Sequence, residues 1–329
     1  MRGRAWAMAL ALGWPAIGAA SPAGDGGPVI TLHPALHIAT AALWGPDEGS
    51  PAELTLYEAR VLARGVVAAP GADPTRLGDT PHVGYFLQLQ TLASPAILDA
   101  RLTAALDRAL RVEAGLTKVP ISDEWLVPAP ELDLRQRSRL ARFIAPRRGV
   151  GVQIAGSVAD GAFGYVAGAY DQDSPRGAAE APPIYAARVD GTLDLGPAAL
   201  RLGAAGGLQP LGDDTDRIAL ADANLRLDLA GLWLTAEVLF ARFEPPADAT
   251  SDPTASFGAV ATVGYALADF RALARYDHFT DALTTDAALI VALGWSPLSP
   301  VLVQVEYESP VEGASPAVLA AYARLAFTL

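Results

Sequence analysis

The chain has no cysteine and a single lysine, Lys118, among its 329 residues. Without cysteine it forms no disulfide, and it offers no thiol for a lipid anchor. Beyond the N-terminal segment, no charge-free apolar run reaches the ~20 residues that cross a bilayer as a helix. The mean hydropathy is nevertheless +0.26, and 51% of the residues are hydrophobic. High hydropathy without spanning helices is expected where apolar and polar residues alternate along strands.

The N-terminus has the features of a secretory signal peptide. Arg2 and Arg4 supply a basic start, residues 5–12 form an apolar core, and residues 18–20, Gly-Ala-Ala, provide a small-residue cleavage site. The apolar stretch is short and Pro15 interrupts it, which argues against an anchor helix. We therefore expect a signal peptide over 1–20, a short leader over 21–27, and one barrel domain over 28–329. The net charge of −12 argues against nucleic-acid binding, which requires a basic surface.

Strict alternation of apolar and polar residues is the strongest pattern in the chain. Successive side chains of a β-strand point to opposite faces, so such a stretch has one apolar and one polar face. The segment around Arg226 shows it: Ala221, Ala223, Leu225, Leu227 and Leu229 share one parity, and Asp222, Asn224, Arg226 and Asp228 share the other. We expect the leucines to face lipid and the charged residues to face water.

The repeated alternation predicts an all-β fold, a transmembrane antiparallel β-barrel of about 16 strands. Short breaks alternate with longer ones along most of the chain, as in outer-membrane barrels with short periplasmic turns and long outer loops. A soluble β-sandwich would instead have polar outer faces. The expected strands cover residues 28–44, 52–67, 81–93, 97–105, 109–118, 148–158, 162–171, 183–194, 199–207, 217–229, 232–244, 255–267, 270–279, 284–296, 300–308 and 316–329.

Several aromatic residues lie near the ends of these strands. In membrane barrels such residues form girdles at the two interfaces, and ordinary packing within the strands is the alternative. The sequence leaves both interpretations open for Trp233, Phe243, Tyr265, Phe270, Trp295 and Tyr307.

The connection over residues 119–147 is too long for a simple turn and is the candidate functional segment. Its end and the start of the next strand carry six arginines within 14 positions, in a chain that is otherwise acidic. Guanidinium groups suit phosphate-like anions because they donate two parallel hydrogen bonds. The candidate pore and anion-binding residues are therefore Lys118, Arg135, Arg137, Arg139, Arg142, Arg147 and Arg148.

An ordered set of residues surrounds this segment: Gly115, Lys118, Pro120 and Glu124, then Arg137 and Ser138, then Pro146, Arg148, Gly151, Val152 and Gln153. Through these residues the sequence resembles the family of phosphate-selective porins O and P, over roughly residues 54–170. The resemblance implies a barrel of about 16 strands, a homotrimer, a long third loop folded into the pore, and basic residues that guide anions.

The chain departs from this family in its charges. Phosphate-selective members are rich in pore lysines, and an aspartate that follows their loop arginine is Gly149 here. The expected inward positions hold ten arginines and twelve carboxylates, so the wall alone predicts no anion preference. The loop arginines either form a ring that attracts anions or pair with nearby carboxylates. The sequence leaves both open; the nearby carboxylates are Asp123, Glu124, Glu131 and Asp133.

The sequence thus favours a porin of the bacterial outer membrane that lets small hydrophilic solutes, with anions and phosphate as candidates, diffuse passively. We expect no catalytic residue, no metal and no cofactor, and partners limited to outer-membrane lipid, solutes and further copies of the chain. Two alternatives remain. A barrel enzyme would need a Ser/His/acid cluster at one rim, and a structural or adhesion barrel would have a plugged lumen.

Overall fold

The computed structural model describes residues 29–44, 53–68, 81–92, 96–171, 182–210, 217–245, 252–298, 301–313 and 317–328. The expected signal peptide and leader lie outside these residues, as do parts of several long connections. Within the described ranges, no helix has the length and apolar character needed to cross a membrane.

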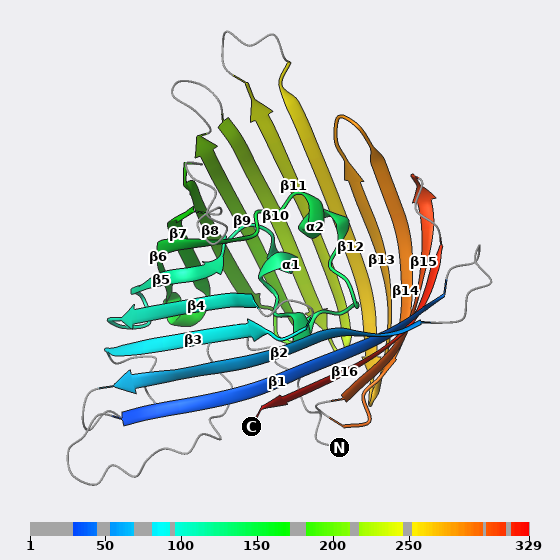
Figure 1. The fold of residues 1–329 in the computed structure, drawn as a ribbon, viewed down its shortest axis with the longest axis horizontal. Coiled ribbons are helices and arrows are strands. Elements are labelled where there is room, and N and C mark those ends of the chain that lie inside the picture. Colours follow the sequence, from blue (N-terminus) through cyan, green and yellow to red (C-terminus); the bar gives the residue numbers. More distant parts are fainter. Residues whose placement is uncertain are drawn as a thin grey trace.

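The described residues form a closed antiparallel barrel of 16 strands, in which each strand pairs with its sequence neighbours and β1 pairs with β16 (Figure 1). This confirms the expected fold and strand count. The strands are β1 (Val29–Trp44), β2 (Glu53–Ala68), β3 (His82–Gln90), β4 (Ala96–Ala105), β5 (Arg111–Lys118), β6 (Arg148–Val158), β7 (Phe163–Asp171), β8 (Ile184–Asp194), β9 (Ala198–Pro210), β10 (Arg217–Leu229), β11 (Leu232–Glu244), β12 (Thr254–Leu267), β13 (Phe270–Thr280), β14 (Thr285–Trp295), β15 (Val301–Glu312) and β16 (Val318–Thr328).

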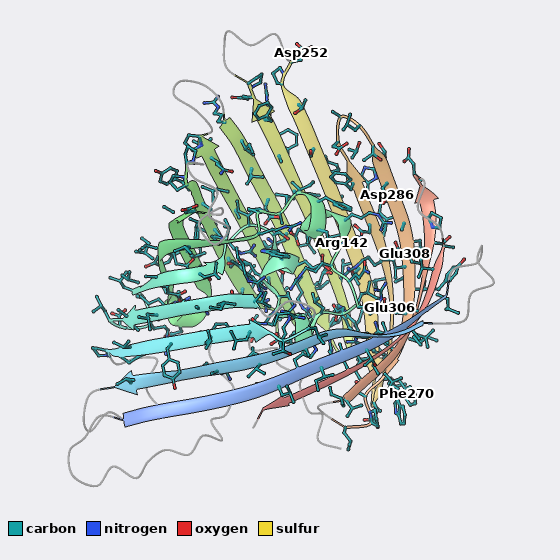
Figure 2. The ribbon with its side chains drawn as sticks, viewed as in Figure 1. Arg142, Asp252, Phe270, Asp286, Glu306 and Glu308 are labelled. Carbon is teal, nitrogen blue, oxygen red and sulfur yellow. The ribbon has the colours of Figure 1, made fainter. Side chains whose placement is uncertain are left out.

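The alternation sets the two faces of the wall as expected. On β8, Tyr185 and Val189 are 52% and 44% exposed on the outer face, whereas Arg188 between them is buried inside. On β15, Val303 and Val305 are exposed outside while Gln304 is buried. The outer surface is therefore apolar, and the side chains drawn in Figure 2 project from both faces of the strands.

The short connections are tight hairpin turns. Between β10 and β11, Ala230 and Gly231 both have positive φ, at 46° and 89°. Two consecutive residues of this kind make the hairpin turn whose twist matches that of the flanking strands. The turn between β10 and β11 lies at one end of the barrel. The long connection between β5 and β6 begins and ends at the opposite end.

The aromatic residues divide between the two interpretations. Tyr265, Phe270, Trp295 and Tyr307 lie exposed on the outer face, and the rings of Phe270 and Trp295 stack at 6.4 Å. Trp233 instead shares the inward parity of β11 and is buried against Leu134 of the long connection. It belongs to the interior packing, because the barrel there is filled by protein.

Candidate functional site

The segment 119–147 lies inside the barrel and packs against one side of its inner wall. It contains two short helices, α1 (Asp123–Leu126) and α2 (Arg139–Phe143), and a single 3-10 turn, η2 (Ala129–Glu131). Figure 1 shows both helices against the inner side of the strands drawn in green and yellow. We call residues 119–147 the inner loop. This placement agrees with the expectation of a long loop that folds inward.

An apolar cluster fixes the inner loop to the wall. Ile121 and Leu140 have no exposed surface, and they pack among inward side chains of β7, β8 and β10 to β13. Burying one such side chain contributes about 1.5–3 kcal/mol. The wall residues of this cluster stand where a water-lined barrel would have polar groups: Tyr170, Ile184, Ala186, Leu220, Leu239, Val260 and Phe279.

Two inward glycines allow the close approach. A Cβ atom on Gly258 of β12 would lie 2.8 Å from Leu140 Cβ, and a Cβ atom on Gly207 of β9 would lie 2.6 Å from Ile121 Cδ1. Both distances are shorter than van der Waals contact. Glycine at these positions therefore lets the inner loop lie directly on the strands.

Arg139 is the main polar anchor of α2. Its backbone N–H donates to both carboxylate oxygens of Asp277, at 3.0 and 2.9 Å. Its Nε donates to Asp286 at 2.7 Å, and its Nη2 donates to Glu308 at 2.9 Å. Burial would lower the pKa of Arg139, but the hydrogen bonds to Asp286 and Glu308 and the charge of Asp277 raise it. One guanidinium thus ties the inner loop to β13, β14 and β15.

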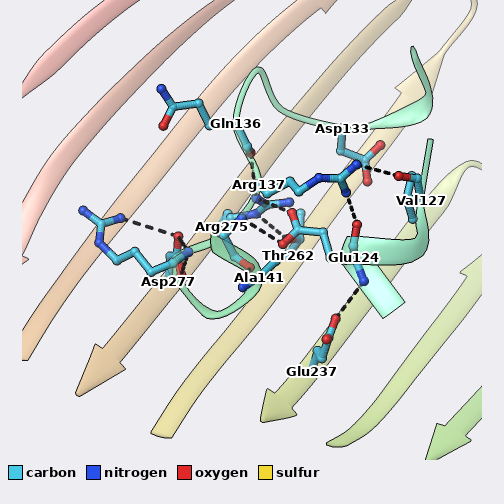
Figure 3. A network of polar contacts seen from close by, with 12 residues as sticks. Glu124, Val127, Asp133, Gln136, Arg137, Ala141, Glu237, Thr262, Arg275 and Asp277 are labelled. Carbon is cyan, nitrogen blue, oxygen red and sulfur yellow. Dashed lines mark hydrogen bonds and ion pairs between the residues drawn. The ribbon is translucent and has the colours of Figure 1, made fainter. Parts of the chain in front are cut away.

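Glu124 is a second anchor, shown in Figure 3 with the strands behind it. Its carboxylate accepts from the Ser138 backbone N–H at 2.8 Å and lies 2.8 Å from Arg275 Nη1 on β13. Its own backbone N–H donates to Glu237 Oε2 on β11 at 3.0 Å. The residue therefore joins α1, the start of α2 and two strands.

Three cations surround Trp125 and hold the carboxyl end of α1. The Lys118 ammonium donates to the carbonyls of Trp125, Leu126 and Val127, at 2.7, 3.1 and 3.1 Å. The Arg137 guanidinium donates to the carbonyls of Glu124 and Val127 and lies 5.0 Å from the Trp125 ring centroid. Arg148 also faces that ring and forms a two-bond contact with Asp99, at 3.2 and 3.1 Å.

The remaining candidates differ in exposure. Arg135 is buried, with its backbone N–H donating to Glu306 Oε1 at 2.6 Å. Arg142 is exposed and donates to Gln136 Oε1 at 2.9 Å, and Arg147 is exposed. Of the seven candidate residues, Arg142 and Arg147 thus keep exposed side chains, while the other five contact carbonyls, carboxylates or Trp125.

Several charges of the inner loop pair with the wall, in addition to the contacts that Arg137 and Arg142 make within the loop. Loop arginines contact wall carboxylates, as Arg139 does. Loop carboxylates contact wall arginines: Asp123 lies 2.8 Å from Arg188 on β8, and Asp133 lies 3.8 Å from Arg271 on β13. From the sequence, these wall charges are expected to line the water-filled lumen. Alternation shows which face of a strand a residue is on, but it does not show which segment covers that face.

The wall from β2 to β6 carries a different set of side chains. Arg64, Phe86 and Arg101 lie in one register row across β2, β3 and β4, and the Arg101 guanidinium is 5.2 Å from the Phe86 ring centroid. Arg101 and Arg111 lie 3.6 and 2.8 Å from Glu113. Glu113 in turn accepts from Gln153, whose carbonyl accepts from the Tyr170 hydroxyl. We call β2–β6 the arginine wall.

The end of the inner loop that contains η2 approaches β16. The Arg324 Nη1 donates to the Leu132 carbonyl at 2.9 Å. Burial raises the pKa of Glu131 there, although the charges of Arg324, Lys118 and Arg64 act in the opposite direction. A carboxylate of the inner loop therefore stands within electrostatic reach of arginines on β16 and β2.

No family model matches the sequence, and no curated protein matches it closely enough to be a relative. Solved structures do match its shape. OmpT of Vibrio cholerae, described as a trimer form, superposes with a TM-score of 0.65 at 10% identity, covering 91% of this chain and 99% of that one. The anion-selective porin from Comamonas acidovorans has a TM-score of 0.65 at 12% identity, with 91% and 100% covered. Salmonella typhi OmpF, in complex with daunomycin, has a TM-score of 0.65 at 10% identity, with 92% and 99% covered. The likeness is one of fold.

Proposed function

We propose that the chain is a porin that lets small hydrophilic solutes diffuse passively across an outer membrane, with a preference for anions. The observation that carries the proposal is the division of the lumen. Buried side chains and ion pairs fix most of the inner loop to β7–β15, and Lys118, Arg148 and Arg324 hold its remaining parts. Arg64 and Arg101 of the arginine wall stay at least partly exposed and are left to line the passage. An apolar outer face and a charged interior suit a barrel with lipid outside and water inside.

The charges on the uncovered side of the lumen favour anions. On the arginine wall, Lys118 and Arg148 contact the inner loop, and Arg148 also pairs with Asp99. The other described charged side chains there are Arg60, Arg64, Arg101 and Arg111 and the carboxylate of Glu113. Fixed arginines at a constriction replace part of an anion's lost hydration. The exposed Arg142 and Arg147 add positive charge on the loop side, whereas Arg135, Arg137 and Arg139 hold the loop.

Three further points belong to the same proposal. Secretion through a signal peptide cut after Ala20 would deliver the chain to the envelope, and mass spectrometry of the mature N-terminus tests it. The lipid partner follows from the apolar outer face. A homotrimer is supported by the family resemblance and by the trimeric OmpT neighbour, and the mass of the protein in mild detergent tests it.

The experiment is a planar-bilayer recording of the purified protein in a salt gradient. We expect stepwise conductance and a reversal potential on the anion side, which shrinks as rising salt screens the charges. Replacing Arg60, Arg64 and Arg101 together by alanine should move the reversal potential toward the cation side.

The matched control removes arginines from the outer end of the barrel. Arg217 and Arg242 contact Glu244 on the rim of β10 and β11, and their replacement by alanine should leave selectivity unchanged. A native protein that prefers cations would overturn the anion preference. A native protein that passes no current would return the plugged barrel and the barrel enzyme to consideration.

A further inference from the structure

Two phenylalanine rings in the interior each have an arginine guanidinium beside them. On the arginine wall, the Arg101 guanidinium lies 5.2 Å from the Phe86 ring centroid. On the inner loop, the Arg142 guanidinium lies 5.3 Å from the Phe143 ring centroid. The two pairs come from different elements, since Phe86 is on β3 and Phe143 ends α2.

Phe143 exposes far more surface than its neighbours in α2. Leu140 and Ala141 are buried against the wall, as is Ile144, which follows the helix, whereas Phe143 is 58% exposed. The centroid of the Phe143 ring lies 5.1 Å from that of the Phe279 ring on β13, so one side of Phe143 packs against the wall. Phe279 lies one residue before the end of β13, at the end of the barrel where the inner loop also begins. Phe143 therefore lies toward that mouth of the lumen.

A phenylalanine ring with a guanidinium beside it, in a charged interior, is suited to a solute that has both an aromatic ring and a negative charge. An aromatic ring gains from packing against phenylalanine, and a carboxylate accepts paired hydrogen bonds from guanidinium. Arginine also stacks on aromatic faces. A small inorganic anion would use the guanidinium alone.

We infer that the preferred solutes are aromatic monocarboxylates, which contact Arg142 and Phe143 at the mouth and Arg101 and Phe86 further in. This inference rests on the proposed function, because it takes the lumen to be an anion pathway. The positive charge of the arginines alone would not distinguish aromatic carboxylates from small inorganic anions.

The test is block of the chloride current by benzoate added to the long-loop side, with acetate and inorganic phosphate as comparison anions. We expect benzoate to reduce the current saturably at concentrations where acetate and phosphate have no effect. Replacing Phe86 and Phe143 by alanine should raise the half-blocking benzoate concentration about tenfold, since both ring contacts are lost. Phe143→Leu, which keeps an apolar side chain without a ring, should give an intermediate value.

The control is Phe240→Ala, because Phe240 is 41% exposed on the lipid-facing side of β11, and it should leave the block unchanged. Equal block by benzoate and acetate, or an unchanged block in the double alanine variant, would overturn the inference while the anion current stands. If the native protein passes no chloride, the proposed function fails. Saturation-transfer NMR between the detergent-solubilised protein and benzoate then decides the inference, with transfer expected for the native chain and lost in the double variant.

Discussion

Both sides of the lumen carry arginines and carboxylates, but the inner loop buries those on one side and leaves arginines on the other side partly exposed. On the side from β8 to β15, Arg188 and Asp277 are buried and contact groups of the inner loop. On the arginine wall, the Arg101 side chain remains 36% exposed. A count of inward charges made from the sequence does not distinguish the covered side from the uncovered side. The inner loop covers one set, so under the proposed function the selectivity would depend on the arginine wall.

The largest effect should come from removing the anchor of α2. Arg139→Ala leaves Asp277, Asp286 and Glu308 without their shared cation, and breaking a buried pair costs about 3–5 kcal/mol. We expect a lower free energy of unfolding in urea and a noisier single-channel current. Arg142→Ala is the control, since its guanidinium is exposed and contacts only Gln136 among the described polar groups. Equal losses in both variants would contradict the anchoring role.

The two faces of the wall itself can be compared next. Leu225 and Asn224 are neighbours on β10, on opposite faces by the alternation of the strand. An arginine facing lipid near mid-bilayer costs about 2–4 kcal/mol, whereas one facing the lumen costs little. Leu225→Arg should therefore impair assembly in vesicles far more than Asn224→Arg, as heat-modifiable mobility on gels would show. Equal tolerance would mean that the register is wrong.

The close approach of loop and wall gives a smaller effect. Gly258→Ala places a Cβ atom 2.8 Å from Leu140 Cβ, and crowding of this kind costs about 1–3 kcal/mol. In Gly206→Ala, the nearest atom would be 3.6 Å away, so that variant should unfold like the native protein. Thermal unfolding compares the two, and a native-like Gly258→Ala would show that the loop does not lie on β12.

The smallest effect is the pH dependence of selectivity. Burial raises the pKa of Glu131 above its ordinary value of 4.5. As the pH falls through that raised pKa, the carboxylate becomes neutral and the loop face loses a negative charge. The anion preference should therefore grow on acidification, starting at a pH above 4.5. Reversal potentials of Glu131→Gln should show the larger preference at neutral pH and a weaker pH dependence; a native-like pH response would assign the titration to another group.

Much of the barrel could be predicted from the sequence, because alternation reports which face of a strand is apolar. The expected strand 217–229 is β10 to the residue, while β9 runs on to Pro210 and β15 to Glu312, beyond the expected ends. The inner loop's position could not be derived in this way. Leu239 and Val260 stand at inward positions, and only the packing of Leu140 over them shows why they are apolar. The roles of Glu124 and Arg275 likewise depend on contacts between distant segments.

The inner loop rests on β12, with Leu140 directly over Gly258, and the Arg101 side chain of the arginine wall stays partly exposed. Because the native chain has no cysteine, this placement can be tested with a cysteine pair, Leu140→Cys with Gly258→Cys, oxidised in the folded protein. Their Cβ atoms need to move only slightly to reach the ~3.5–4.5 Å of a disulfide. We predict a disulfide detected by mass spectrometry with the chloride conductance retained, and none for Leu140→Cys with Ala259→Cys on the outer face of the same strand. Failure of the first pair to form would show that α2 does not lie on β12. Loss of the current when the disulfide forms would show that the inner loop has to leave this position for ions to pass.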